Sequence, residues 1–193
     1  MDRIIVERTP YIFACCDALV RPEDVASAAR FQNESRRREH LAWRRIVRRE
    51  LGVKVGIAYN DVGAPVVDKP NTYISVAHSS DVVAVAISDR AIGIDIERTT
   101  RDFERAKSRY MSPSEASLSS AEHWAAYVWT AKEALYKLLG RRGVELRDDL
   151  RIKSYDEATR VMLARLAEDI AARVEIVTYE DNIVVAVASY QEY

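Results

Sequence analysis

The sequence predicts an α+β fold built from two similar halves, and an internal repeat carries most of that prediction. The run Val82–Ala86 reads Val-Val-Ala-Val-Ala, and Val184–Ala188 repeats it about half a chain length later. Each copy follows another strand-like run, Tyr73–Ala77 or Val174–Tyr179, and a helical stretch precedes each copy in its own half. One apolar pentapeptide can also recur by chance, so duplication and coincidence both remain open from the repeat alone.

The remaining elements follow from local start and stop signals. Asn33 is a plausible helix cap, and glycines at 52 and 140 end helical patterns. We expect helices over Arg21–Arg30, Asn33–Leu51, Ser112–Gly140 and part of Glu157–Arg173. Strands are expected over Ile4–Val6, Tyr11–Cys15, Lys54–Tyr59, Tyr73–Ala77, Val82–Ser88, Ala91–Glu97, Leu150–Ser154, Val174–Tyr179 and Ile183–Ala188.

Composition excludes several classes of protein. The 193 residues are 48% hydrophobic and 31% charged with a formal net charge of −1, which gives no general attraction to nucleic acid or membranes. No apolar run approaches the ~20 residues of a membrane helix, and the first ten residues lack a signal-peptide layout. The adjacent Cys15 and Cys16 are interpreted as apolar residues of a buried strand without a redox or metal role. We expect a cytoplasmic protein.

A strand with two acidic residues is the first candidate for chemistry. In Ala91–Glu97 the side chains alternate, so three isoleucines share one face and Gly93, Asp95 and Glu97 share the other. Two carboxylates at this spacing repel unless a cation lies between them, and Mg²⁺ prefers such oxygen ligands. We expect the isoleucines in the core and the glycine to leave room for a ligand. The alternative is an amphipathic strand with a solvated acidic face.

A helix with mixed aromatic and charged residues is the second candidate. Its polar face is predicted to carry Trp129, Lys132, Glu133, Tyr136 and Lys137, opposite a face of alanines and leucines. Glu133 and Lys137 also form a favourable i, i+4 pair, so a solvated salt bridge is the alternative. That alternative does not explain why two aromatic residues lie among the charges.

Basic residues and one histidine complete the candidates. The helix Asn33–Leu51 contains Arg37, Arg44 and Arg48 on one stripe, which is either a solvated face or a phosphate-binding surface. His78 ends a strand at a polar turn, where it is either a binding residue or an ordinary loop residue. The sequence contains no Gly-x-Ser-x-Gly elbow, no zinc-ligand spacing and no Walker loop.

Together these motifs resemble the 4′-phosphopantetheinyl transferases. Ser75–Ser79 resembles their serine-histidine-serine segment, Gly93–Glu97 their Gly-Ile-Asp-Ile-Glu motif, and Trp129–Lys137 their Trp-x-x-Lys-Glu-Ala-x-x-Lys motif. Further similar segments are Leu41–Arg44, Arg109–Glu115 and Gly140–Gly143, so the resemblance covers roughly residues 36–150. One departure is Ala64, which stands where the family often has the lysine of Gly-Lys-Pro.

The resemblance is strongest to the single-chain, pseudodimeric branch, typified by the surfactin-synthetase activating enzyme. It implies two α+β halves related by pseudo-twofold symmetry, each with a small antiparallel sheet and helices, with coenzyme A at their junction. We expect the N-terminal half to span 1–97 and the C-terminal half 98–193. The resemblance also implies a monomer that binds neither nucleic acid nor membrane.

The same resemblance implies transfer of 4′-phosphopantetheine from coenzyme A to a serine of an acyl or peptidyl carrier protein, with release of 3′,5′-ADP. Glu133 is then the proton acceptor and Lys137 stabilises the leaving phosphate. A Mg²⁺ ion is held by Asp95, Glu97 and Glu133, with Glu97 bound directly or through water. Coenzyme A contacts are expected from His78, Arg44, Lys132, Arg37 and Arg48.

Two rival functions use the same residues. A magnesium-dependent nucleotide pyrophosphate hydrolase needs the carboxylates but no carrier protein. A nucleic-acid-binding module would use the arginine-rich helix, although the net charge and the absence of aromatics on the arginine stripes disfavour it. The sequence does not indicate which carrier protein is modified.

Overall fold

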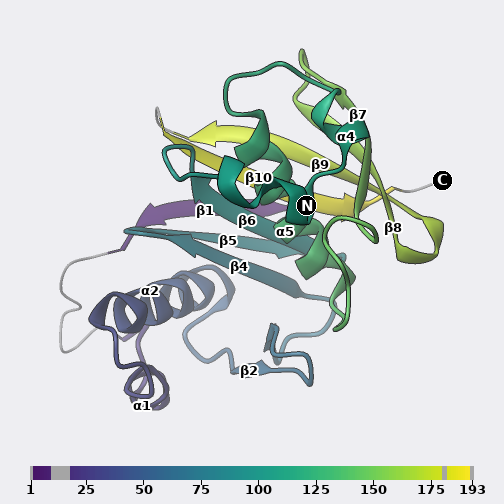
Figure 1. Ribbon diagram of the computed structural model, residues 1–193. Helices are drawn as coiled ribbons and strands as arrows, with labels where there is room; N and C mark the ends of the chain where they lie inside the picture. Colours follow the sequence, from purple (N-terminus) through teal and green to yellow (C-terminus); the bar gives the residue numbers. More distant parts are fainter. Residues whose placement is uncertain (1, 10–17, 180–181, 192–193) are drawn as a thin grey trace. The chain divides into compact units, whose positions relative to one another are not determined.

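The computed structural model describes residues 2–9, 18–179 and 182–191, and it has the α+β fold that the sequence predicts. The chain divides into two compact units, Met1–Arg90 and Ala91–Tyr193. Each unit has its own antiparallel sheet with helices (Figure 1). The predicted strand Tyr11–Cys15, with both cysteines, lies outside the described residues.

The N-terminal unit packs one long helix on a three-stranded sheet of order β1-β5-β4. Trp43, Ile46 and Val47 of the helix form a core cluster with Val83 and Val85 of the central strand. The strands β2 and β3 form a separate hairpin. The elements are β1 (Arg3–Arg8), α1 (Pro22–Ala28), α2 (Glu34–Leu51), β2 (Ile57–Tyr59), β3 (Pro65–Val67), β4 (Tyr73–Ser79) and β5 (Val82–Ser88).

The C-terminal unit packs its long helix α5 on a five-stranded sheet of order β6-β10-β9-β8-β7. Ala134, Leu135 and Leu138 of that helix enter a core with Val184 and Ala186 of β10. Its strands are β6 (Ile92–Arg98), β7 (Arg151–Asp156), β8 (Val161–Leu166), β9 (Ile170–Tyr179) and β10 (Ile183–Tyr190). Its helices are η1 (Glu104–Ala106), α3 (Lys107–Tyr110), α4 (Pro113–Ala116), α5 (Trp124–Leu139) and η2 (Ala167–Asp169).

The two repeated pentapeptides occupy equivalent places in the two sheets. Val82–Ala86 lies in β5, which pairs with β1 on one side and β4 on the other. Val184–Ala188 lies in β10, which pairs in the same way with β6 and β9. In both units the chain runs from a first strand through one or more short helices to a long helix, and then through a hairpin to two final strands; the C-terminal unit has three short helices before α5 and the further short helix η2 before β9. This shared topology supports duplication over chance recurrence.

The expected ends of both long helices are confirmed, and so is the start of α2, whereas the expected helical span Ser112–Gly140 holds two separate helices, α4 and α5. Asn33 caps α2 by accepting hydrogen bonds from the backbone N–H groups of Ser35 and Arg36, and Gly52 ends that helix. Gly140 ends α5 in the left-handed region, at φ 60°, where glycine is favoured over other residues.

The expected helix within Glu157–Arg173 is wrong apart from the short 3₁₀ helix η2, because β8 and the start of β9 occupy most of this segment. In β8, Met162, Ala164 and Leu166 are buried while the residues between them are more exposed. That alternation has the period of a strand, not of a helix.

The strand with the two acids belongs to the C-terminal unit. Its Gly-Ile-Asp-Ile-Glu motif was expected in the N-terminal half, whereas the division between the compact units falls between Arg90 and Ala91. The strand β6 pairs with β10 from Ile92 to Arg98, and this long-range pairing is not visible in local sequence. Asp95 and Glu97 therefore share a compact unit with Glu133. Among the described residues, no helix is both long and apolar enough to span a membrane.

Candidate active site

The acidic face of β6 lies under helix α5. A Cβ atom added at Gly93 would overlap the carbonyl oxygen of Ala134, so this glycine lets the helix backbone approach the strand. The expectation that this glycine leaves room for a ligand is therefore wrong, because the backbone of α5 fills that space. The carboxylates are also not on an open face, because Asp95 and Glu97 both contact side chains of α5.

Asp95 forms an ion pair with Lys137 and retains one free acceptor. The Lys137 Nζ donates to Asp95 Oδ1 at 2.8 Å and to the Ile94 carbonyl oxygen at 2.9 Å. The other carboxylate oxygen, Oδ2, is buried and has no hydrogen-bond partner in the described part of the chain. Burial raises the pKa of Asp95, and the Lys137 charge opposes that rise. A buried carboxylate oxygen without a donor is a site where a cation would be stabilised.

Glu133 lies in the field of the same acids. Burial raises the pKa of its carboxyl group, and the negative charges of Asp95 and Glu97 raise it further, against the opposing charges of Lys137 and Arg101. No described residue donates a hydrogen bond to Glu133 in this structure. The structure thus brings the three predicted carboxylates close together, and the ammonium group of Lys137 lies next to them.

Glu97 is held by two donors that the sequence analysis did not assign. The Trp129 Nε1 donates to Glu97 Oε1 at 3.1 Å, and Arg101 forms an ion pair with the same oxygen. The Arg101 guanidinium also lies 5.3 Å from the centre of the Trp129 ring. The sequence pointed to Trp129, because an aromatic residue among charged ones is unusual on a solvated helix face. Nothing in the local sequence pointed to Arg101.

The chemistry of these donors suits a divalent cation, although the protein alone does not form a complete site. A search of the described residues finds no group of three or more histidine, cysteine or acidic side chains arranged to hold a metal ion. Mg²⁺ commonly uses one or two carboxylates and takes its other oxygens from substrate phosphates and water. The buried, unpartnered Oδ2 of Asp95 and the carboxyl group of Glu133 fit that mode of binding.

Lys132 is not on the polar face where the sequence analysis placed it. Its side chain is fully buried and forms an ion pair with Glu115 of α4 at 2.7 Å. Glu115 also accepts hydrogen bonds from the backbone N–H groups of Ser112 and Ile152, so it connects α4, α5 and β7. The expected contact between Lys132 and coenzyme A is therefore replaced by a structural ion pair.

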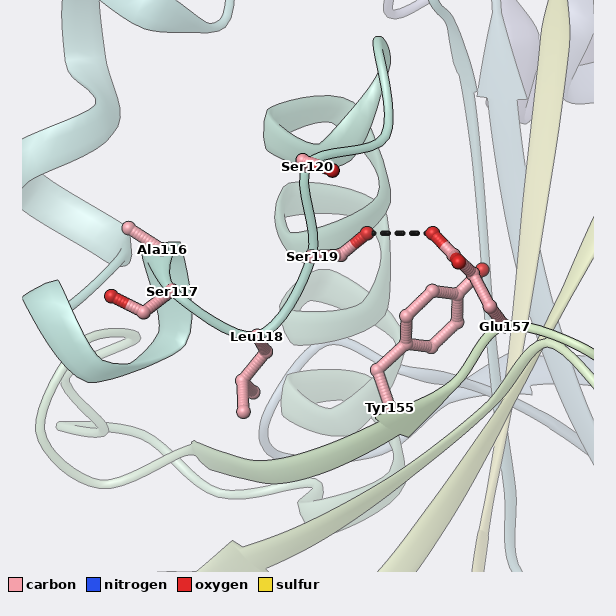
Figure 2. Close-up of a pocket in the computed structure, with 7 residues that line it drawn as sticks. All are labelled: Ala116, Ser117, Leu118, Ser119, Ser120, Tyr155 and Glu157. Atoms are coloured by element: carbon pink, nitrogen blue, oxygen red, sulfur yellow. Dashed lines mark hydrogen bonds between the residues drawn. The ribbon is translucent and has the colours of Figure 1, made fainter.

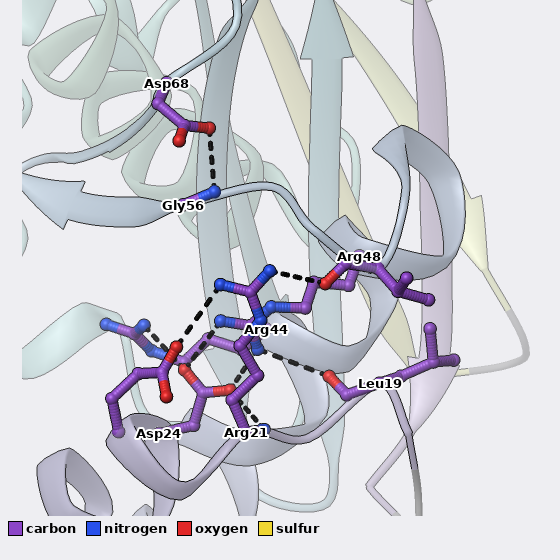
Figure 3. Close-up of polar contacts among 9 residues, drawn as sticks. Leu19, Arg21, Asp24, Arg44, Arg48, Gly56 and Asp68 are labelled. Carbon is purple, nitrogen blue, oxygen red and sulfur yellow. Dashed lines mark hydrogen bonds and ion pairs between the residues drawn. The ribbon is translucent and has the colours of Figure 1, made fainter.

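Arg44 and Arg48 likewise have a buried partner (Figure 3). Both guanidinium groups reach Asp24 of α1, with Arg44 Nη1 at 3.0 Å from Oδ1 and Arg48 Nη2 at 3.0 Å from the same atom. The side chains of all three residues are at most 5% exposed. Burial alone would raise the pKa of Asp24, but the hydrogen bond and charge of Arg48, together with the Arg21 N–H and the Arg44 charge, lower it. These two arginines are thus committed to the fold rather than presented to a ligand.

His78 and Arg37 lie on the surface of the N-terminal unit. Arg37 donates to the backbone oxygen of Phe31 at 2.6 Å. The His78 ring lies 2.5 Å from Arg36 through Nε2 and 3.3 Å from Glu39 through Nδ1. The same Arg36 nitrogen also lies 2.9 Å from Nδ1, so the guanidinium group faces both ring nitrogens. Arg36 and Glu39 were not singled out as site residues, and only the three-dimensional fold brings them to His78.

A pocket in the C-terminal unit contains none of the predicted site residues. It has a volume of about 510 Å³ and lies between the α4–α5 loop and the end of β7 (Figure 2). Ser119 donates to Glu157 across it at 3.1 Å. Its lining residues are Ala116, Ser117, Leu118, Ser119, Ser120, Tyr155 and Glu157. With one acid and no cation, this pocket offers less chemistry than the carboxylates beneath α5.

Comparison with known proteins agrees with the chemistry of β6 and α5. Residues 91–188 match the model of the 4′-phosphopantetheinyl transferase superfamily, a stretch that includes both acidic motifs and covers about half of the chain. The chain therefore belongs to this superfamily of transferase enzymes.

A 4′-phosphopantetheinyl transferase of Bacillus subtilis is a more specific relative. It is 24% identical over 160 residues, which cover 67% of this chain and 70% of that protein. Family membership establishes phosphopantetheine transfer in general as the class of reaction.

Proposed function

We propose that this enzyme transfers 4′-phosphopantetheine from coenzyme A to a serine of an acyl or peptidyl carrier protein in a magnesium-dependent reaction. The observation that carries the proposal is the group of three carboxylates around Lys137, within the segment that matches the superfamily. The two-unit topology supports assignment to the single-chain, pseudodimeric branch.

The proposed reaction is a displacement at phosphorus. The serine oxygen forms a bond to the phosphorus that bears pantetheine, and the bond from that phosphorus to the 3′,5′-ADP oxygen breaks. Glu133 accepts the serine proton, and its raised pKa favours this role because a more basic carboxylate is the better acceptor. Lys137 stabilises the departing phosphate. Asp95, Glu97 and Glu133 would hold Mg²⁺, which supplies positive charge to the pyrophosphate.

Phosphate recognition in the N-terminal unit is proposed for His78 and Arg36 instead of Arg44 and Arg48. Arg36 is exposed and lies against the His78 ring, whereas the two other arginines are buried on Asp24. Arg36→Gln should weaken the binding of coenzyme A, because it removes a charged donor. If the contact is to the 3′-phosphate, dephospho-coenzyme A should lose less affinity.

The decisive experiment is mass spectrometry of a purified apo carrier protein incubated with coenzyme A, Mg²⁺ and the enzyme. Gain of one phosphopantetheine group on the carrier supports the proposal. Cleavage of coenzyme A without a carrier would instead indicate a pyrophosphate hydrolase. Carriers of fatty-acid, polyketide and peptide-synthetase type, tested in parallel, would identify the partner.

The roles of Asp95 and Glu133 can be separated by titrating Mg²⁺ in the same assay. Asp95→Ala should raise the magnesium requirement and be partly rescued at high concentration. Glu133→Gln should lower the maximal rate by roughly 10²–10⁴-fold even at saturating Mg²⁺, because a positioned proton acceptor is lost. If excess Mg²⁺ restored the maximal rate of Glu133→Gln to the wild-type value, Glu133 would be a metal ligand only and not the proton acceptor.

A further inference from the structure

We propose that Trp129 is a positioning residue whose indole N–H fixes the carboxylate of Glu97 for divalent-cation binding. The inference rests on the proposed function, since it concerns the same three carboxylates. Its starting point is the 3.1 Å hydrogen bond from Trp129 Nε1 to Glu97 Oε1. This hydrogen bond joins helix α5 to strand β6. Trp129 itself is not a metal ligand, so the proposed metal binding does not explain the contact directly.

The position of Glu97 in the strand restricts the orientation of its side chain only weakly, so other residues must hold its carboxylate in place. It lies near the end of β6, one residue before the last residue of the strand, and its side chain has more rotatable bonds than that of Asp95. Asp95 is fixed by Lys137, whereas the Glu97 side chain is fixed through Oε1 by Trp129 and Arg101. Groups that orient a metal ligand typically change metal affinity by about 10–100-fold when they are removed.

Trp129 is suited to this role because it is itself held rigidly. Its ring makes an edge contact with the ring of Tyr110 at 5.1 Å and a tilted contact with Phe103 at 6.4 Å. Tyr110 is fully buried, and its hydroxyl group donates to the carbonyl oxygens of Phe103 and Ala125. These ring contacts hold the indole in one orientation, so that its N–H points toward Glu97.

Arg101 adds a second constraint of a different kind. Its guanidinium lies 5.3 Å from the Trp129 ring and 5.4 Å from the Phe103 ring, in addition to its ion pair with Glu97. The Arg101 side chain is 55% exposed, so solvent weakens its ion pair. The Trp129 residue is less exposed, so solvent weakens its hydrogen bond to Glu97 less than it weakens the Arg101 ion pair.

The helix provides a matched control. Trp124 also lies in α5 and also donates a hydrogen bond through Nε1, but to the backbone oxygen of Glu115 at 2.9 Å. Trp124→Phe and Trp129→Phe therefore each remove one indole N–H while keeping an aromatic ring. Only Trp129→Phe removes a hydrogen-bond donor from a carboxylate of the proposed cation site.

The test is a Mn²⁺ titration of each purified protein at saturating coenzyme A without a carrier protein, with free Mn²⁺ followed by electron paramagnetic resonance. The proposed transfer lacks its acceptor under these conditions, so affinity for the cation is measured separately from that activity. Trp129→Phe should raise the dissociation constant about tenfold, and Trp124→Phe should leave it near the wild-type value. A magnesium titration of activity should show the same split, with a raised magnesium requirement and a nearly unchanged maximal rate for Trp129→Phe.

Three results would overturn the inference, and they distinguish its failure from failure of the proposed cation site. Equal Mn²⁺ affinity in wild type and Trp129→Phe, or an equal loss in both tryptophan variants, would leave Trp129 with a packing role only while the proposed function stands. Failure of the wild-type protein to bind Mn²⁺ would remove the proposed cation site itself, and the positioning role with it. Unfolding curves of both variants identify a loss that comes from misfolding.

Discussion

The two units share an arrangement of strands around a long helix and a buried ion pair, yet they differ in charge at the positions where the C-terminal unit has its two acids. In each unit a short helix presents an acid from its first turn to a cation on the long helix: Asp24 to Arg44 and Arg48, and Glu115 to Lys132. Arg44 and Lys132 lie at the same distance along the chain from the glycine that ends their helix, Gly52 or Gly140. This correspondence is independent of the repeated pentapeptide.

The strand registers define where the units differ. Val6 and Arg8 of β1 pair with Ala84 and Val82, whereas Asp95 and Glu97 of β6 pair with the corresponding residues of β10, Ala186 and Val184. The N-terminal unit thus has an apolar and a basic residue where the C-terminal unit has its two acids. The scaffold, including its buried ion pair, is common to both units, whereas the cation-binding chemistry belongs to one.

The buried ion pairs offer the largest expected effect. Lys132→Met should reduce the free energy of unfolding by about 3–5 kcal/mol, because it leaves a buried carboxylate without a countercharge. Arg48→Met should cost less, about 2 kcal/mol, because Arg44 still pairs with Asp24. Urea denaturation of both variants measures the difference. Equal losses would mean that Arg44 does not compensate for the loss of Arg48.

The second comparison concerns the approach of helix to strand. Gly93→Ala should destabilise the protein by about 3 kcal/mol or more, since the new methyl group overlaps the backbone of α5. The corresponding residue in β1 is Ile4, which pairs with Ala86 as Gly93 pairs with Ala188, and its side chain is exposed. Ile4→Ala should therefore cost well under 1 kcal/mol. Thermal unfolding checks both, and a mild effect of Gly93→Ala would show that α5 can move away from β6.

The third prediction concerns the loss of stability at acid pH. We expect His40, in the N-terminal unit, to contribute to this loss. Burial, with the Arg44 charge, lowers the pKa of His40 to about 4, against a partly opposing Asp24 charge. In the unfolded chain the pKa returns to about 6.5, so the unfolded state binds the extra proton first as pH falls. Stability from this group is therefore constant above about pH 6.5 and falls by up to about 3 kcal/mol as pH approaches 4.

The His40→Phe variant tests that expectation while keeping an aromatic ring beside Phe31 and Trp43. The slope of unfolding free energy against pH between 6.5 and 4 should become flatter in this variant. An unchanged slope in His40→Phe would assign the acid sensitivity to other groups.

The sequence was most informative where one element carries the whole signal. The spacing of Asp95 and Glu97 and the pattern of Trp129–Lys137 predicted an acidic cation site, and the structure brings these residues together. The sequence failed for Lys132, Arg44 and Arg48, because helical periodicity assigned them to polar faces. Whether a charged residue faces solvent depends on what packs against it, and the partners Asp24 and Glu115 come from helices elsewhere in the chain.

The sequence by itself determined the α+β class, the long helices with their terminating glycines and the residues that carry the chemistry, because these depend on local backbone preferences and side-chain types. Only the tertiary structure decided which unit holds the acidic strand, why Gly93 is a glycine and which cations are buried. It also brought Trp129 and Arg101 to Glu97. Such contacts join residues that are distant in sequence, and their free energies arise from desolvation and close packing that no local pattern records.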